Sequence, residues 1–184
     1  IAADDLLFEN CLSEYVKNTE RSGSRFLFSY PSVLVSDGDQ ARKYAMETYY
    51  ESVDGFYSLP AGKQFKYLLV NQIPVNPPTL FCHRETLLSM NGFNEQYKCE
   101  DLPLYLEATY RGHRFSLVKE KLVGYRLHSA QLSIRNQTST VNEFWLHEQA
   151  RIKSKYFTVR TILRDPLLYL EYQLEFASKM INAR

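Results

Sequence analysis

Two pairs of adjacent carboxylates are the residues of this sequence best suited to chemistry. Asp4-Asp5 lies near the start of the chain, and Glu100-Asp101 precedes an apolar segment that we expect to be helical. Carboxylates can hold a hard divalent cation such as Mg²⁺ or Mn²⁺, and one carboxylate beside a hydroxyl group can act as a general base. The alternative is structural, because acidic residues at a helix start accept hydrogen bonds from free N–H groups.

Two basic side chains follow the last predicted strand. Arg126 and His128 lie at the end of a strand expected over residues 122–127. A histidine at a strand end can ligate a metal or transfer a proton, and a guanidinium can neutralise a phosphate through two parallel hydrogen bonds. The alternative for His128 is an ordinary packing or surface residue, and for Arg126 a surface ion pair.

The apolar periodicity predicts the elements that position these groups. Helices are expected over residues 7–21, 40–52, 59–70, 84–90, 102–110 and 141–163, with a last helix that Asp165 caps. Strands are expected over residues 25–35, 79–82, 114–118 and 122–127. Gly92 is expected to take a positive φ after the helix over 84–90, and Phe93 to be a core residue. The fold class is therefore α/β up to about residue 135, followed by a helical tail.

The composition excludes several classes of protein. The 184 residues are 45% hydrophobic, which excludes intrinsic disorder, and the formal charge of +1 gives no support to nucleic-acid binding. No apolar run reaches the roughly 18 residues of a membrane span. Cys11, Cys82 and Cys99 form no CxxC pair, which favours a reducing, cytoplasmic location. The start at Ile1 shows no Met and no signal-peptide pattern, so we expect a part of a longer sequence.

Several short segments occur in an order that resembles a known family. They are Cys82-His83-Arg84-Glu85, Asn91-Gly92-Phe93-Asn94-Glu95, Glu100-Asp101-Leu102-Pro103-Leu104, Arg111-Gly112-His113 and Tyr125-Arg126-Leu127-His128. This order resembles the second half of family 2 glycosyltransferases with the GT-A fold. There, a G-G-F-(D/N)-E segment precedes an E-D pair at a helix start, and strands end in Y-R-x-H. Asp4-Asp5 resembles the end of the D-x-D-D segment of that family, and the resemblance covers residues 1 to about 133.

The resemblance implies a function and a role for each residue. It implies the C-terminal half of a Rossmann-like GT-A domain over residues 1–135, with a helical extension over 136–184. The implied reaction is inverting transfer from a nucleotide sugar to a hydroxyl of a saccharide or lipid-linked acceptor, in surface glycan biosynthesis. The roles that it implies are a general base at Asp101, an orienting group at Glu100, a sugar pocket at Gly92 and Phe93, a phosphate contact at Arg126, and Mg²⁺ or Mn²⁺ ligands at Asp4, Asp5 and His128.

The sequence departs from the family pattern at two points. Ala2 stands where the family usually has the first Asp of its D-x-D, which weakens the expected metal site. These 184 residues do not include the nucleotide-binding β-α-β half of the family, so we expect this chain alone to be inactive and its open sheet edge and tail to favour homo-oligomers.

Two alternatives use the same residues differently. The chain can be a non-catalytic interaction or self-association module, in which the acidic pairs only cap helices. It can instead be a fragment of a metal-dependent phosphotransfer enzyme or hydrolase. In each case the expected location is the cytoplasm, which includes the inner face of the membrane.

Overall fold

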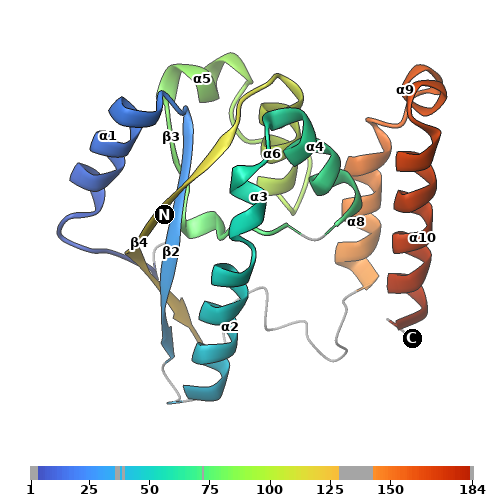
Figure 1. Cartoon of the computed structure of the whole chain (residues 1–184). Coiled ribbons are helices and arrows are strands. Elements are labelled where there is room, and N and C mark those ends of the chain that lie inside the picture. Colours follow the sequence, from blue (N-terminus) through green and yellow to red (C-terminus); the bar gives the residue numbers. More distant parts are fainter. Residues whose placement is uncertain (1–3, 36–37, 39, 72, 129–142, 183–184) are drawn as a thin grey trace.

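The fold is a mixed α/β arrangement around a small sheet, shown by a computed structural model that describes residues 4–35, 38, 40–71, 73–128 and 143–182. The four-stranded sheet has the order β1-β4-β2-β3 (Figure 1). Its strands are β1 (Leu6–Leu7), β2 (Phe26–Val35), β3 (Phe81–Cys82) and β4 (Phe115–Leu127). The central strands β2 and β4 are parallel, and β1 and β3 pair antiparallel to them at the two edges. The α/β class predicted from the sequence is confirmed.

Strand β4 differs from its prediction, because the two strands expected over 114–118 and 122–127 form one strand of 13 residues. The polar residues between them do not end the strand, since β4 continues to pair with β2 through register shifts around Tyr30. Pro31 lies at this irregularity, as expected of a residue that cannot donate to a ladder. The result is a bent strand that reaches both ends of the sheet.

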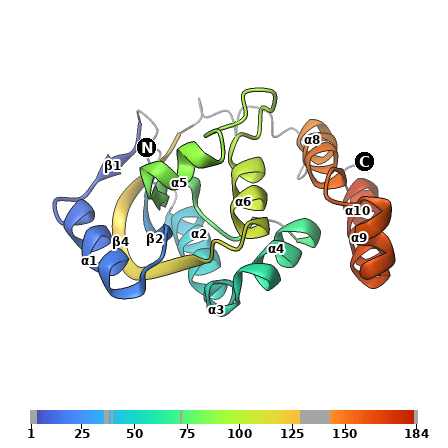
Figure 2. The ribbon, with the colours of Figure 1, turned by 90° about the horizontal axis from the view of Figure 1, so that it is seen from above.

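Helices cover both faces of the sheet (Figures 1 and 2). One face carries α1 (Cys11–Ser22), which ends at Gly23 with φ +65°. On the other side lie α2, α3, α4 and α6, while the short α5 follows β3. Their bounds are Gln40–Ser52 for α2, Asp54–Ser58 for α3, Ala61–Val70 for α4, Arg84–Ser89 for α5 and Asp101–Tyr110 for α6, with a 3₁₀ turn over Pro77–Thr79. The longer helices agree with the predicted ones, except that α1 begins four residues later because Leu7 belongs to β1. The short helix α3 and the 3₁₀ turn were not predicted.

Alternation along β2 supplies both layers of the core. Phe26 and Phe28 are fully buried on the side of α3, α4 and α6, where they pack against Phe115 of β4. Leu27 points to the opposite face and packs in a second cluster with Cys11 and Tyr15 of α1. Fully burying a large apolar side chain contributes about 1.5–3 kcal/mol, so this alternation fixes the register of β2.

The C-terminal segment forms three helices where the sequence predicts two. They are α8 (Glu143–Ser154), α9 (Val159–Arg164) and α10 (Pro166–Asn182), and residues 141–142 of the predicted helix lie outside the described residues. The break occurs at Thr158, whose side chain accepts a hydrogen bond from the Thr161 N–H and so starts a new helix. The predicted cap at Asp165 is confirmed, because its carboxylate accepts from the Leu168 N–H at 3.2 Å.

These helices pack beside α4 and α6, on the side away from α1 (Figure 2). Ile152 of α8 joins the main core, and Leu168 packs against it. Among the described residues, no helix combines the length and the apolar character that crossing a bilayer requires.

Candidate functional site

The antiparallel pairing of β1 with β4 brings four predicted site residues together. Leu6 pairs with Gly124, so Asp4 and Asp5 lie beside the last residues of β4. Asp4 Oδ2 lies 2.7 Å from His128 Nε2, and the Asp4 carbonyl accepts from Arg126 Nε at 2.8 Å. These contacts join residues that are separated by 122 and 124 positions in the sequence.

The carboxylate of Asp5 is buried and only partly satisfied. Its Oδ1 accepts the Arg126 backbone N–H at 2.9 Å, whereas its Oδ2 is buried and has no hydrogen-bond partner among the residues that the structure describes. Burial raises the pKa of Asp5, and the neighbouring Asp4 raises it further. A cation or a proton donor at this oxygen would therefore be stabilised.

The neighbouring Asp4 is more exposed and has the opposite shift. The hydrogen bond from His128 is the largest cause that lowers the pKa of Asp4, and the charge of Arg126 acts in the same direction. The helix-cap interpretation of this pair is wrong, because the residues after it form β1 and not a helix. The group is instead an acidic and basic cluster at one end of the sheet, which we call the Asp4–His128 cluster (Asp4, Asp5, Arg126 and His128).

The fit of this cluster to a divalent ion is partial. Within the described ranges, no group of three or more His, Cys, Asp or Glu side chains is arranged to hold a metal ion. Asp4, His128 and the unpartnered oxygen of Asp5 supply donors of the right chemistry. Mg²⁺ commonly takes one or two protein carboxylates and completes its shell with phosphate oxygens and water, so these side chains alone do not form a complete metal site.

The second acidic pair lies at the start of α6, as predicted. Asp101 Oδ1 accepts the Leu102 N–H at 2.8 Å and a hydrogen bond of 3.1 Å from the Cys99 thiol. Burial raises the pKa of Asp101 above its usual value, and the charge of the adjacent Glu100 adds to this shift. Glu100 is exposed and its side chain makes no capping bond. A local contact of Asp101 with the helix and a chemical role are both compatible with this geometry.

Tyr50 of α2 is a tyrosine whose pKa is influenced by groups near both acidic regions. Burial raises the pKa of Tyr50, and the next causes include Tyr125 of β4 and Asp101 of α6. The side-chain amide of Asn76 acts in the opposite direction and lowers the pKa of Tyr50. Asn76 is 2% exposed, and neither polar atom of its amide has a hydrogen bond within normal limits. The end of β4 and the start of α6 therefore share a buried polar neighbourhood.

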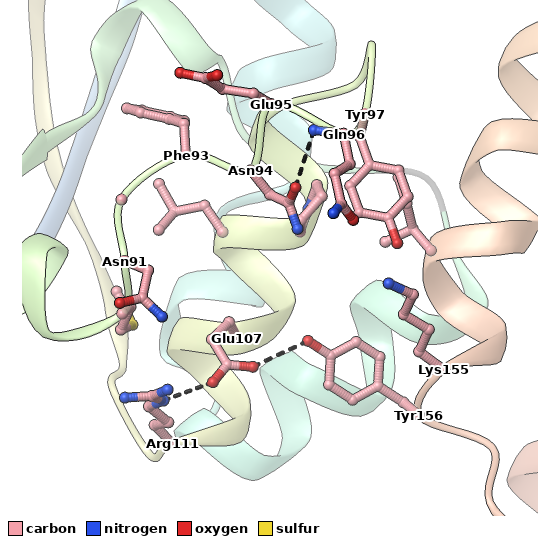
Figure 3. Close-up of a pocket in the computed structure, with 15 residues that line it drawn as sticks. Asn91, Phe93, Asn94, Glu95, Gln96, Tyr97, Glu107, Arg111, Lys155 and Tyr156 are labelled. Atoms are coloured by element: carbon pink, nitrogen blue, oxygen red, sulfur yellow. Dashed lines mark hydrogen bonds and ion pairs between the residues drawn. The ribbon is translucent and has the colours of Figure 1, made fainter.

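A separate pocket of about 570 Å³ lies between the loop after α5, helix α6 and the end of α8 (Figure 3). Gly92 and Phe93, predicted to form a sugar pocket, line it, whereas Glu100 and Asp101 do not. The predicted positive φ of Gly92 is confirmed at +67°, and Asn91 also has a positive φ of 64°. These two left-handed residues turn the loop so that Phe93 lies at the pocket, where it is 47% exposed.

Glu107 is the polar centre of this pocket. Its carboxylate accepts from Arg111 Nε at 2.6 Å and from the Tyr156 hydroxyl at 3.2 Å, and Figure 3 shows it between these two side chains. On the other wall, Lys155 Nζ lies 4.9 Å from the ring centroid of Tyr97. None of these side chains was predicted as a site residue. The four-residue spacing of Glu107 and Arg111 predicts their ion pair, whereas no local signal points to Tyr156.

Comparisons with protein-family models, with curated proteins and with solved structures found no match for this chain.

Proposed function

We propose that this chain is the C-terminal part of an inverting, family 2-like glycosyltransferase with a GT-A fold. The observation that supports this most directly is the Asp4–His128 cluster. The motif resemblance requires the D-x-D-D-like segment and the Y-R-x-H segment to act together, and contacts of 2.7 to 2.9 Å join them across more than 120 positions. The mixed α/β fold is compatible with the proposal.

The Asp4–His128 cluster would bind the diphosphate of a nucleotide sugar. Arg126 contributes positive charge beside Asp4, and His128 is a further hydrogen-bonding group at the end of β4. Mg²⁺ or Mn²⁺ would be held by Asp4 and by oxygens of the diphosphate itself, with Asp5 and His128 beside it, and would neutralise charge on the leaving diphosphate when bound. The buried oxygen of Asp5 is the feature of this chain that favours a cation there.

Asp101 would be the general base of the transfer. The acceptor O–H attacks the anomeric carbon, the bond from that carbon to the diphosphate oxygen breaks, and the proton of the hydroxyl goes to the Asp101 carboxylate. Nucleoside diphosphate leaves with the electron pair of the broken bond. Burial raises the pKa of Asp101, which makes it a stronger base than an exposed aspartate.

The pocket beside α6 would bind a saccharide unit of the acceptor away from the reacting hydroxyl, since Asp101 does not line it. It combines exposed aromatic surface at Phe93 with hydrogen-bonding groups on Asn91, Glu107 and Arg111. Its volume of about 570 Å³ falls within the roughly 300–1,000 Å³ that is usual for ligand sites. A sugar ring has a matching surface, with apolar faces and a few directed polar groups.

Metal binding can be tested on the chain as it is. We expect Mn²⁺ to raise the melting temperature, by about 3–6 °C at ten times its dissociation constant, since the gain in free energy is then about 1.4 kcal/mol. Asp4→Asn should remove this shift. Asp54→Asn is the matched control, because Asp54 pairs with Lys119 and lies outside the cluster. No response with or without uridine or guanosine diphosphate would favour the interaction-module alternative.

Catalysis requires the longest natural protein that contains these residues. There, Asp101→Asn should lower kcat for sugar transfer by roughly 10²–10⁴-fold with little change in KM for the donor. Asn still accepts the Leu102 N–H, so a melting curve should remain close to that of the wild type. Near-normal turnover would exclude Asp101 as the base, and activity on phosphoesters in place of nucleotide sugars would favour the hydrolase alternative.

A further inference from the structure

Helix α10 exposes an apolar face that nothing in the described part of the chain covers. Leu167, Leu170, Leu174 and Ile181 are 69%, 53%, 63% and 74% exposed, and the exposed Ala177 lies between the last two. On the inner side of the same helix, Tyr172 is buried and packs against Phe157. The helix is therefore apolar on both sides, which is not the pattern of a helix with one side in water.

The spacing of this outer face is that of a helix–helix seam. Steps of three, four, three and four residues separate positions 167, 170, 174, 177 and 181, which is an a/d repeat over two heptads. The face is a narrow stripe, and Gln173 and Ser178 are exposed beside it. Elsewhere, exposed leucines such as Leu12 of α1 and Leu88 of α5 belong to no such repeat.

We infer that α10 of a second copy of this chain covers this stripe in a two-fold dimer. The charge distribution supports a second copy of the same helix as the partner, because Glu171 is the only charged residue among the exposed described positions of α10. Glu175 and Lys179 pair with each other at 2.9 Å on the adjoining side of the helix. Two copies therefore meet through neutral stripes, without the like-charge repulsion that usually keeps identical surfaces apart.

The absence of basic residues from the exposed described positions of α10 argues against a lipid surface. Helices that lie on anionic membranes carry Lys and Arg along the polar side, whereas α10 has one lysine, Lys179, which is tied to Glu175. A strict a/d stripe is also narrower than the wide apolar face of an interfacial helix. Both features favour a helix as the occupant.

The size of the stripe predicts a weak dimer. A helix of 17 residues is about 25 Å long and about 10–12 Å in diameter, so a single helix pair gives an interface at the low end of the size range, below about 1,200 Å². Such interfaces associate reversibly, and we expect a dissociation constant in the range of about 1–100 μM. Leu174 is the middle position of the stripe, so it lies near the two-fold axis whether the two helices run parallel or antiparallel.

The test is sedimentation equilibrium of the 184-residue chain between about 1 μM and 1 mM, a range that spans the expected dissociation constant. We expect a reversible monomer–dimer equilibrium, and Leu170→Lys combined with Leu174→Lys should weaken it by at least about 100-fold. Leu12→Lys is the matched control, because Leu12 is 58% exposed, comparable to Leu170 and Leu174, but lies on α1. Both substitutions are at exposed positions, so we expect each variant to fold, and a melting curve checks this.

A mixing experiment makes the assignment specific. Chains with Leu174→Lys and chains with Leu174→Glu should each be monomeric, and an equimolar mixture should form heterodimers because the two charges then face each other. A wild-type chain that is monomeric throughout, or a dimer that the Leu170/Leu174 variant leaves intact, would overturn the inference. So would binding of the wild-type chain to anionic vesicles that the same substitutions abolish, because a membrane would then be the occupant.

Discussion

Lys153 places a titratable group inside the packing of α8, where it makes stability depend on pH. The residue is 4% exposed, and its Nζ donates to the Asn71 carbonyl at the end of α4 at 2.9 Å. Burial lowers the pKa of Lys153 to about 7, and the positive charge of Lys179 acts in the same direction. The unfolded chain keeps an ordinary lysine with a pKa near 10.5, so above pH 7 the unfolded state binds more protons than the folded state.

The sign and size of the effect come from this difference. Where the unfolded state binds one proton more than the folded state, the free energy of unfolding rises by about 1.36 kcal/mol per pH unit. Because Lys153 titrates near 7, stability should rise by about 1 kcal/mol from pH 7 to pH 8, which corresponds to about 2–4 °C in melting temperature. Burial raises the pKa of Cys11, Cys82 and Cys99. Above pH 8 the thiols of the unfolded chain therefore lose protons before those of the folded chain, which opposes the rise in stability.

The assay is urea unfolding at pH 7.0, 7.5 and 8.0 under reducing conditions. Lys153→Met keeps the length of the side chain, suits the apolar neighbours Leu146 and Tyr172, and should remove the rise with pH. Lys63→Met, at an exposed position of α4, is the control that should retain it. An unchanged slope in Lys153→Met would refute the reasoning, because another group would then be the source of the pH dependence.

Three further substitutions test the packing that supports the site. Gln64→Leu should lower the free energy of unfolding by about 2–4 kcal/mol in urea titration, because it removes two hydrogen bonds of 3.0 and 2.8 Å to the backbone of buried Phe115. Gly124→Ala should cost about 1–3 kcal/mol by the same measurement, since a Cβ there would lie 2.9 Å from Leu34 Cδ1, and a normal stability would show that β4 can shift. Tyr15→Phe should cost about 1 kcal/mol, because its hydroxyl bonds of 2.9 and 2.5 Å are lost while the ring remains, and a thermal melt unchanged within error would contradict this.

The elements with strong local signals were predictable from the sequence. Helix α2 has the predicted bounds Gln40–Ser52, and the Asp165 cap with the adjacent Pro166 marks the start of α10. The failures lie where tertiary contacts override local pattern. Leu7 fits a helical face, yet it pairs with Val123 and forms an edge strand. Similarly, the charged residues 119–121 favour a loop, yet β4 continues through them because Val118 and Lys121 on either side of a register shift both pair with β2.

The site was predictable in its residue types but not in its grouping. Strand-end position pointed to Arg126 and His128, and helix-start position pointed to Asp101. Sequence spacing carries no information on the distance between Asp4 and His128, because that distance depends on which strand β1 joins. The same holds for the pocket, where Tyr156 reaches Glu107 only because α8 packs beside α6.

The Asp4–His128 cluster depends on a short piece of sheet. Strand β1 pairs with β4 at two residue pairs, Leu6 with Gly124 and Leu7 with Val123, and the Phe8 N–H adds a hydrogen bond of 3.1 Å to the Leu122 carbonyl. Gly124 lies close to both neighbouring strands, since a Cβ at position 124 would lie 2.9 Å from Leu34 Cδ1 and 3.4 Å from the Cβ of Leu6. The same pairing buries the Asp5 oxygen that has no partner, and such a group opposes the pairing unless a cation or a donor satisfies it. A ligand that binds the cluster would therefore also stabilise the attachment of β1, so ligand binding and protection of the β1 amides from hydrogen exchange should rise together.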